Sequence, residues 1–162
     1  MEQYELVYET LKNMNITYDI VEHPPVFTTE EADSYIEGME GVRTKSLFLN
    51  NKKKTAYYLL IMDDSKQLDM NRFKEIVGEK QLSFSSSERL MEKVSLQPGA
   101  VSIFGLINNK EKDIKVFLDK EILSERLMSF HPNDNTKTIF ISTEDMYKFI
   151  KDIGYEYNVV EI

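Results

Sequence analysis

A single lysine, Lys45, lies within a strand-like segment, residues 41–49, that becomes increasingly apolar toward its end. A second strand-like segment, residues 55–62, follows a short polar turn, so the two are expected to form a β-hairpin. Two hairpin registers place Lys45 opposite Leu59 or Leu60, and neither supplies a carboxylate. A lysine on an apolar surface needs an anion, a water-filled cleft or a path for its ammonium to solvent. Lys45 is therefore either an anion-binding residue or a lysine whose stem covers the core.

Two histidines and one glycine are the next candidates for chemistry. His23 and His131 each precede a proline where a strand-like segment ends. Each is either a structural residue that bonds to the backbone of a turn or a site residue, because imidazole exchanges protons near neutral pH. Gly99 follows Pro98 and opens a run of small residues, which lets a backbone approach a ligand and expose N–H donors. A tight turn is the alternative interpretation of this run.

Familiar local signatures of other chemistries are missing. The sequence has no glycine-rich nucleotide-binding pattern, no H-E-x-x-H and no nucleophile elbow. With no cysteine and two histidines, it excludes cysteine nucleophiles and argues against a metal site. Asp63, Asp64 and Asp134 are expected to be solvated turn residues rather than magnesium ligands. We therefore expect neither a metal nor a cofactor.

Length and charge narrow the class of protein. The 162 residues suffice for one domain with a hydrophobic core, and we expect a single domain over residues 1–162. No apolar run reaches the roughly 20 residues that span a bilayer. The acidic N-terminus does not resemble a secretory signal, so we expect a cytoplasmic protein without a membrane partner. The net charge of −8 argues against non-specific nucleic-acid binding, and we expect no DNA partner.

The elements that must hold the candidate residues follow from hydrophobic periodicity, caps and turns. The segments expected to be helices are residues 2–13, 28–37, 70–77, 85–94 and 143–153. The segments expected to be strands are residues 18–22, 41–49, 55–62, 81–84, 100–104, 114–119, 126–130, 137–142 and 157–160. Residues 55–62 are apolar on both faces, which predicts a central, covered strand. Helices and strands alternate without a regular βαβ rhythm, so we expect a mixed α/β (α+β) fold with a sheet of about seven strands.

Four segments, taken in order, resemble the YbaK / prolyl-tRNA synthetase-associated editing-domain family and its free-standing members. They are residues 23–32, 44–49, 98–106 and 131–136. The resemblance implies a curved mixed sheet, largely antiparallel, packed with helices around one cleft. It also implies an activity, hydrolysis of the ester that links a wrong amino acid to tRNA. For the free-standing members the expected substrate is alanine on tRNA(Pro), with prolyl-tRNA synthetase or an elongation factor as further partners.

The resemblance also implies roles for individual residues. Lys45 is expected to contact the terminal adenosine of the tRNA or its phosphate. N–H groups of the Gly99 loop orient the ester carbonyl and the attacking water, and His131 is the cleft histidine. A ribose hydroxyl of the substrate helps to activate the water. The positions implied to bind substrate are His23, Phe27, Thr44, Ser46, Ala100, Val101, Ser102, Ile103, Phe104 and Asn135.

Two departures from the family pattern leave a second hypothesis open. The family commonly has asparagine where this chain has Ser46, and proline where it has Ile103. These changes bear on amino-acid selectivity. They also motivate the alternative that the same cleft binds an aminoacyl-adenosine or a free amino acid without catalysis. An aminoacyl ester is already activated, so positioned water and oxyanion stabilisation suffice for its hydrolysis.

Overall fold

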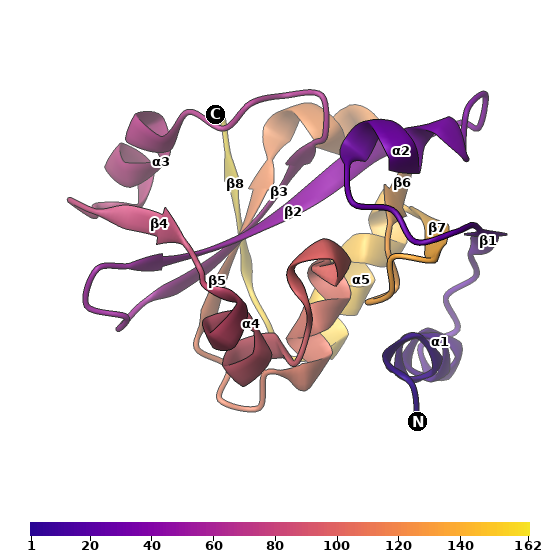
Figure 1. The fold of residues 1–162 in the computed structure, drawn as a ribbon, viewed down its shortest axis with the longest axis horizontal. Coiled ribbons are helices and arrows are strands. Elements are labelled where there is room, and N and C mark those ends of the chain that lie inside the picture. The colour runs from indigo at the N-terminus through magenta and orange to yellow at the C-terminus, as the bar shows by residue number, and fades with distance from the viewer.

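The structure, a computed structural model, describes all 162 residues (Figure 1). The α-helices are α1 (Gln3–Asn13), α2 (Thr29–Ser34), α3 (Met70–Val77), α4 (Ser87–Val94) and α5 (Thr143–Asp152). The strands are β1 (Asp19–Glu22), β2 (Val42–Asn51), β3 (Tyr57–Asp63), β4 (Leu82–Phe84), β5 (Ile114–Asp119), β6 (Leu127–Phe130), β7 (Lys137–Ser142) and β8 (Tyr157–Val160). Three 3₁₀ turns are η1 (Pro98–Ala100), η2 (Ile103–Asn108) and η3 (Lys120–Ser124).

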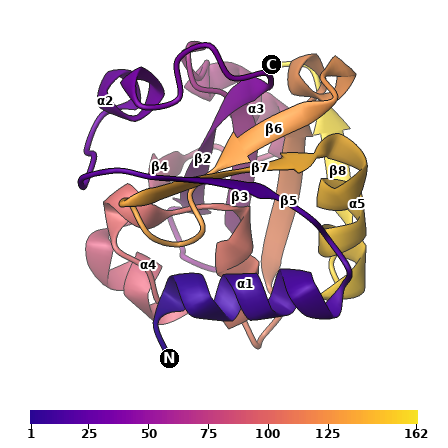
Figure 2. The same ribbon diagram turned by 90° about the vertical axis from the view of Figure 1, so that its right-hand side faces the viewer.

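The strands form one mixed sheet in the order β1-β7-β6-β2-β3-β5-β8, and β4 pairs with β2 off this path. Four pairings are antiparallel, and β2–β6, β3–β5 and β5–β8 are parallel. Figure 2 shows the β1–β7–β6 part of the sheet with α1 below it. The mixed α/β class and the mixed sheet are confirmed, whereas the parallel pairs could not be recognised from local sequence. None of the helices combines the length and the apolar composition that crossing a membrane requires.

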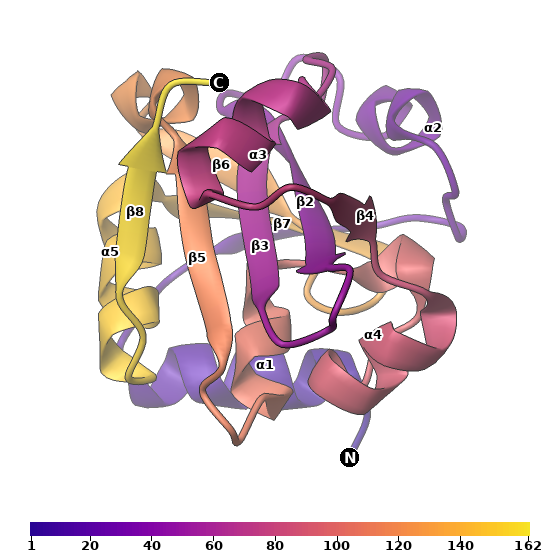
Figure 3. The same ribbon diagram turned by 90° about the vertical axis from the view of Figure 1, so that its left-hand side faces the viewer.

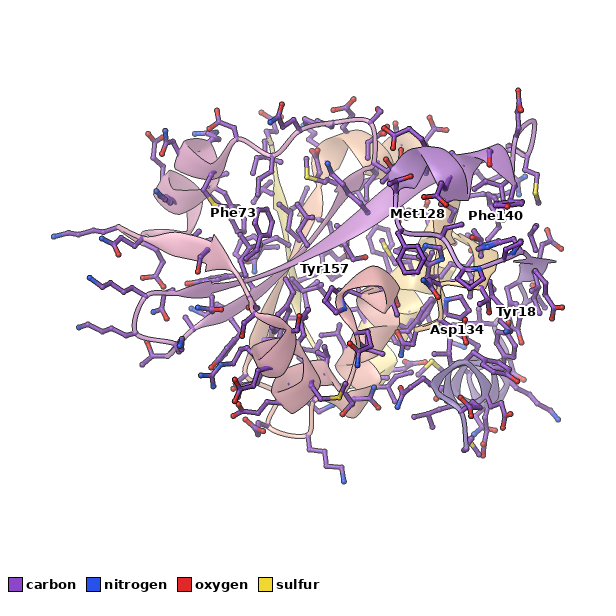
Figure 4. The ribbon with its side chains drawn as sticks, viewed as in Figure 1. Tyr18, Phe73, Met128, Asp134, Phe140 and Tyr157 are labelled. Carbon is purple, nitrogen blue, oxygen red and sulfur yellow. The ribbon has the colours of Figure 1, made fainter.

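Strand β3 divides the core because successive side chains of a strand point to opposite faces. Tyr57, Leu59 and Ile61 join the larger hydrophobic cluster, which also contains residues of α1, α4 and α5. Leu60 and its even-numbered neighbours join a smaller cluster built around Phe73 of α3. Figure 3 shows α3 in front of β3, and Figure 4 shows Phe73 beside the sheet. The prediction that this strand is central and covered on both faces is therefore confirmed.

The predicted hairpin register is wrong. Lys45 pairs with Met62, and neither Leu59 nor Leu60 lies opposite it. The difference arises because the loop is closed by a side chain: Asn51 Oδ1 accepts hydrogen bonds from the N–H groups of Thr55 and Ala56 at 2.9 and 3.2 Å. The first strand therefore continues to Asn51, and the loop is longer than predicted. As a result, each residue of the first strand pairs with a later residue of the second strand than expected.

The predicted strand at residues 100–104 is also wrong, because this segment forms η1, a short link and the start of η2. Ser102 Oγ accepts a hydrogen bond from the N–H of Phe104 at 3.0 Å, which caps the turn. The apolar side chains of Ile103 and Phe104 are fully buried in the larger cluster. The apolar run that suggested a strand instead supplies core residues to a 3₁₀ turn. Over so few residues, hydrophobic periodicity cannot distinguish a strand from such a turn.

Candidate active site

A cavity of about 190 Å³ lies where β2 and β6 separate. These parallel strands pair at Val42–Met128 and Arg43–Ser129 only. Thr44 extends the contact by one hydrogen bond, from its Oγ1 to the carbonyl oxygen of Ser129 at 2.6 Å. Beyond it the strands diverge, and the space between them is lined by residues of α2, β2, η1, β6 and β7 and by the loops around them. The lining residues are Val26, Phe27, Thr28, Thr29, Ala32, Asp33, Ile36, Thr44, Lys45, Ser46, Asp64, Pro98, Gly99, Val101, Phe130, His131 and Thr138.

One wall of the cavity is α2 and the loop that precedes it. Thr28 caps the helix, since its Oγ1 accepts a hydrogen bond from the N–H of Glu31 at 3.1 Å. The loop is fixed to the turn after β6 by reciprocal hydrogen bonds. The N–H of Val26 donates to the carbonyl of Asn135 at 3.2 Å, and Asn135 Nδ2 donates to the carbonyl of Val26 at 2.9 Å. Phe27 therefore follows directly after a residue that is held in place by two hydrogen bonds.

Lys45 lines this cavity as a half-buried cation without an ion-pair partner. None of the salt bridges in the protein includes it, and its ammonium donates no hydrogen bond to a protein acceptor. A cation whose ammonium has no protein partner but borders a cavity is suited to bind an anionic ligand. This position agrees with the prediction that the partner of Lys45 lies outside the protein.

His131 presents a basic nitrogen in this region. Its Nδ1 lies 2.8 Å from the carbonyl oxygen of Lys137, which can only accept, so Nδ1 carries the proton and Nε2 has a free lone pair. Burial is the main reason that the pKa of His131 is lowered below its usual 6.5, and the neighbouring His23 lowers it further. The imidazole is therefore neutral at physiological pH and can orient water or accept a proton through Nε2.

His23 has a different environment and does not line the cavity. Its Nδ1 lies 2.9 Å from the carbonyl of Pro24, and its Nε2 lies 2.9 Å from Thr138 Oγ1. The ring stacks on Tyr35 and meets His131 edge to face, with centroids 6.1 Å apart. With both nitrogens occupied, His23 supports the cavity wall and the position of His131, which corresponds to the structural interpretation of this histidine.

The Gly99 loop contributes backbone to the cavity. Gly99 and Val101 line it, and the N–H of Val101, just after η1, donates to no backbone carbonyl. A Cβ added at Gly99 would meet Asn135 Nδ2 at 3.6 Å, which is ordinary contact. The small residue therefore keeps the cavity open rather than avoiding a clash.

The remaining predicted substrate-binding residues divide into three groups. Phe27, Thr44 and Ser46 line the cavity, as does Val101. Ala100 and Asn135 line an adjacent hollow that also includes Phe27, Pro98 and Gly99. The structure does not bring Ser102, Ile103 and Phe104 to the cavity; all three are buried beneath the loop and at most 2% exposed.

A carboxyl pair that the sequence did not reveal, Asp33 and Asp64, also lines the cavity. The expectation that Asp64 is a solvated turn residue is wrong, since it is half-buried and its N–H donates to the carbonyl of Arg43 at 2.8 Å. Burial, the hydrogen bond with Asp33 and the charge of Asp33 raise the pKa of Asp64 to about 8, although Lys45 opposes the shift. The pair therefore holds a shared proton at neutral pH. Its position at the end of β3, facing the start of β2, was hidden by the wrong hairpin register.

These features define a class of site: a small polar cavity in a mixed α/β sheet, with an unpaired cation, a neutral imidazole and a free backbone N–H. Such groups can position an activated ester and a water molecule. The chain matches the Aminoacyl-tRNA editing domain family over residues 23–149, a range that contains every residue of the candidate site. The protein belongs to this family.

Individual relatives agree with this assignment. The chain is 33% identical to the prolyl-tRNA editing protein ProX of Acetoanaerobium sticklandii over 163 residues, covering 100% of this chain and 99% of that protein. It is 32% identical over 152 residues to prolyl-tRNA synthetase associated domain-containing protein 1 of Bos taurus, covering 91% and 88%. A crystal structure of a candidate trans-editing enzyme for prolyl tRNA synthetase has the same fold, with a TM-score of 0.77 at 17% identity, covering 100% of this chain and 98% of that one.

Proposed function

We propose that the protein is a trans-editing deacylase that hydrolyses the ester of mischarged tRNA(Pro), with Ala-tRNA(Pro) as the preferred substrate. The observation that carries the proposal is the unpaired ammonium of Lys45 in the same small cavity as the free Nε2 of His131. Family membership and the ProX relative support the reaction class.

In the proposed mechanism, Lys45 holds the phosphate or ribose of the terminal nucleotide and thereby fixes the ester in the cavity. Water attacks the ester carbonyl, and its proton passes to His131 Nε2 or to the free ribose hydroxyl of the substrate. The N–H of Val101 donates to the oxyanion that develops. The C–O bond to the ribose then breaks, and the ribose oxygen takes up a proton. The products are the free amino acid and uncharged tRNA.

Selectivity follows from size. The cavity of about 190 Å³ is below the roughly 300–1,000 Å³ of typical ligand pockets, so it suits a small aminoacyl group. Limited discrimination by a synthetase, roughly 10–200-fold per methylene, is the reason that a second, smaller site is useful. Ser46 is shorter than the asparagine common in the family and leaves more space in the cavity. This space affects whether a seryl or cysteinyl ester is also accepted.

The protein has a net charge of −8, so its affinity for bare tRNA is expected to be modest and dependent on salt. Delivery by prolyl-tRNA synthetase or an elongation factor is therefore part of the proposal. A deacylation panel tests it: tRNA(Pro) charged with alanine, serine, cysteine or proline, followed by alanine on other tRNAs. Preferential release of alanine from tRNA(Pro) is expected. Binding of a non-hydrolysable aminoacyl-adenosine without any turnover would instead support the non-catalytic binding module.

A further inference from the structure

Phe27 is the most exposed large apolar side chain beyond the chain terminus, at 78%, although both of its neighbours along the chain form backbone hydrogen bonds. Its neighbour Val26 is 3% exposed and is fixed to Asn135 by the two reciprocal hydrogen bonds described above. An aromatic ring held in water by a fixed loop contributes nothing to the hydrophobic core. Such a ring is, however, suited to contact a ligand.

Phe27 stands between two hollows. It lines the cavity of about 190 Å³ and also a second hollow of about 660 Å³. Pro98 and Gly99 are likewise shared, so the two spaces are continuous around these three residues. The smaller cavity suits an aminoacyl group and part of a ribose. The attached nucleobase must then extend outward, past Phe27 and over the second hollow.

The second hollow suits a neutral polar ring better than a phosphate. Its lining includes no lysine or arginine, and its one charged residue is Asp134, labelled in Figure 4. That carboxylate already accepts hydrogen bonds from the N–H and the hydroxyl of Thr136. Side-chain amides supply the remaining polarity. Among them, Asn133 is 5% exposed, and its Nδ2 has no acceptor in the protein. An unpaired buried amide donor is costly unless a ligand or water completes it.

We propose that Phe27 is the stacking platform for the terminal nucleobase of the tRNA, which lies over the second hollow while the aminoacyl ester occupies the cavity. The inference rests on the proposed function and adds a base-binding site to it. Base–aromatic stacking needs only an accessible π-face, so Phe27 contributes affinity for the nucleoside end without reading its sequence. The phosphate contact of Lys45 and the base contact of Phe27 would then fix the two sides of the same nucleotide.

The test compares two proteins on two substrates, as in a double-mutant cycle. Alanyl-minihelices carry either the terminal adenine or an abasic ribose at the acylated position, and kcat/KM for alanine release is measured for wild type and Phe27→Ala. Phe27→Ala is expected to lower kcat/KM roughly 5- to 150-fold on the adenine substrate, the range that stacking of one base gives. It is expected to have no effect on the abasic substrate. Phe27→Trp keeps a stacking face and is expected to retain activity on the adenine substrate.

A matched control is Phe84→Ala, which removes another exposed phenylalanine, 56% exposed, that lines neither hollow. It is expected to leave both substrates unaffected. Equal losses for Phe27→Ala on both substrates would show a structural role and overturn the base site, as would no loss on either. If wild type releases no alanine at all, the proposed function fails. In that case the stacking proposal is decided by binding to amide-linked alanyl-minihelices. Phe27→Ala is expected to weaken the affinity for the minihelix with the terminal adenine and to leave the affinity for the abasic one unchanged.

Discussion

Lys45 and Lys93 are both withdrawn from solvent, yet their surroundings are opposite. Lys93, 8% exposed, donates hydrogen bonds to Glu111 at 2.6 Å and Asp113 at 2.7 Å. Its ammonium also lies 4.5 Å from the ring centre of Tyr57. Although burial opposes the charge, the hydrogen bonds to Asp113 and Glu111 raise the pKa of Lys93. Lys45 has no protein partner and faces a cavity.

Under the proposed function, one side-chain type serves stability in one region and binding in another. The Lys93 region is complete within the protein: Asn109 Nδ2 donates to Asp113, and the Tyr155 hydroxyl donates to Asn109 Oδ1 at 2.6 Å. Such a network ties α4 to the loop before β5 and leaves nothing for a ligand. The Lys45 region leaves a cation and an imidazole nitrogen without partners, so a substrate is needed to complete it.

The largest expected effect on activity comes from substitution of the unpaired lysine, Lys45. Lys45→Ala is expected to lower the rate of alanine release from Ala-tRNA(Pro) by about 10²–10³-fold, the loss typical of one preorganised donor. Its free energy of unfolding is expected to change by less than about 1 kcal/mol, because the ammonium has no ion pair or hydrogen bond in the protein and loses only its attraction to the charge of Asp64. Activity assays and urea unfolding measure the two quantities. Lys53→Ala, in the exposed turn of the hairpin, is the control and keeps full activity. Equal rates for Lys45→Ala and wild type would contradict the role of Lys45.

The paired lysine is expected to behave in the opposite way. Lys93→Met leaves two carboxylates without their cation, and we expect a loss of about 2–3 kcal/mol in the free energy of unfolding, less than for a fully buried pair because Glu111 reaches solvent. Activity per folded molecule stays unchanged. The control is Lys120→Met, which breaks an exposed pair with Glu161 and is expected to cost less than about 1 kcal/mol. Similar losses for both variants would show that the Lys93 network adds no more than a surface pair.

The sequence was sufficient for features determined locally. The Thr28 cap, the apolar faces of β3 and most element positions follow from residues adjacent along the chain. The hairpin register was missed because one side chain, Asn51, closes a longer loop than the turn residues suggest. The partners of Lys45 and Lys93 could not be distinguished either. Whether a lysine is paired depends on residues far along the chain, which only the tertiary structure brings together.

Asp33 and Asp64 illustrate the same limit at the candidate site. They are 31 positions apart and become neighbours because α2, which carries Asp33, and the end of β3, which Asp64 follows, border the same cavity. Neither carboxylate belongs to a periodic pattern or a known motif. In contrast, the segments of the family resemblance were visible in the sequence because each is continuous, and they correctly identified the family.

A third prediction concerns the pH at which the site is active. Burial lowers the pKa of His131 below 6.5, so its Nε2 stays unprotonated at neutral pH. Alanine release is expected to stay constant as the pH falls to 6.5 and to decrease only below it. The same shift means that stability falls below pH 6.5, because the unfolded chain binds this proton more readily. Rates over pH 5–8 on wild type and His131→Gln measure the effect, and His131→Gln is expected to lose the acid limb. A wild-type midpoint above 6.5 would contradict a neutral His131.

The smallest expected effect is the cost of the shared proton beside Lys45. The pKa of Asp64 is raised to about 8 in the folded protein, so the native state keeps a proton that the unfolded chain releases above its ordinary pKa of 3.8. Stability therefore decreases as the pH rises from about 4 to about 8. Asp64→Asn removes this loss and is expected to stabilise the protein by about 1 kcal/mol at pH 8.5, a value reduced from the full shift because the carboxyl is partly solvated. Urea unfolding at pH 5 and 8.5 measures it, with the exposed Asp152→Asn as the control. If Asp64→Asn were no more stable than wild type at pH 8.5, the carboxyl pair would carry no such cost, and Lys45 would offset the charge of Asp64 more fully than burial and Asp33 oppose it.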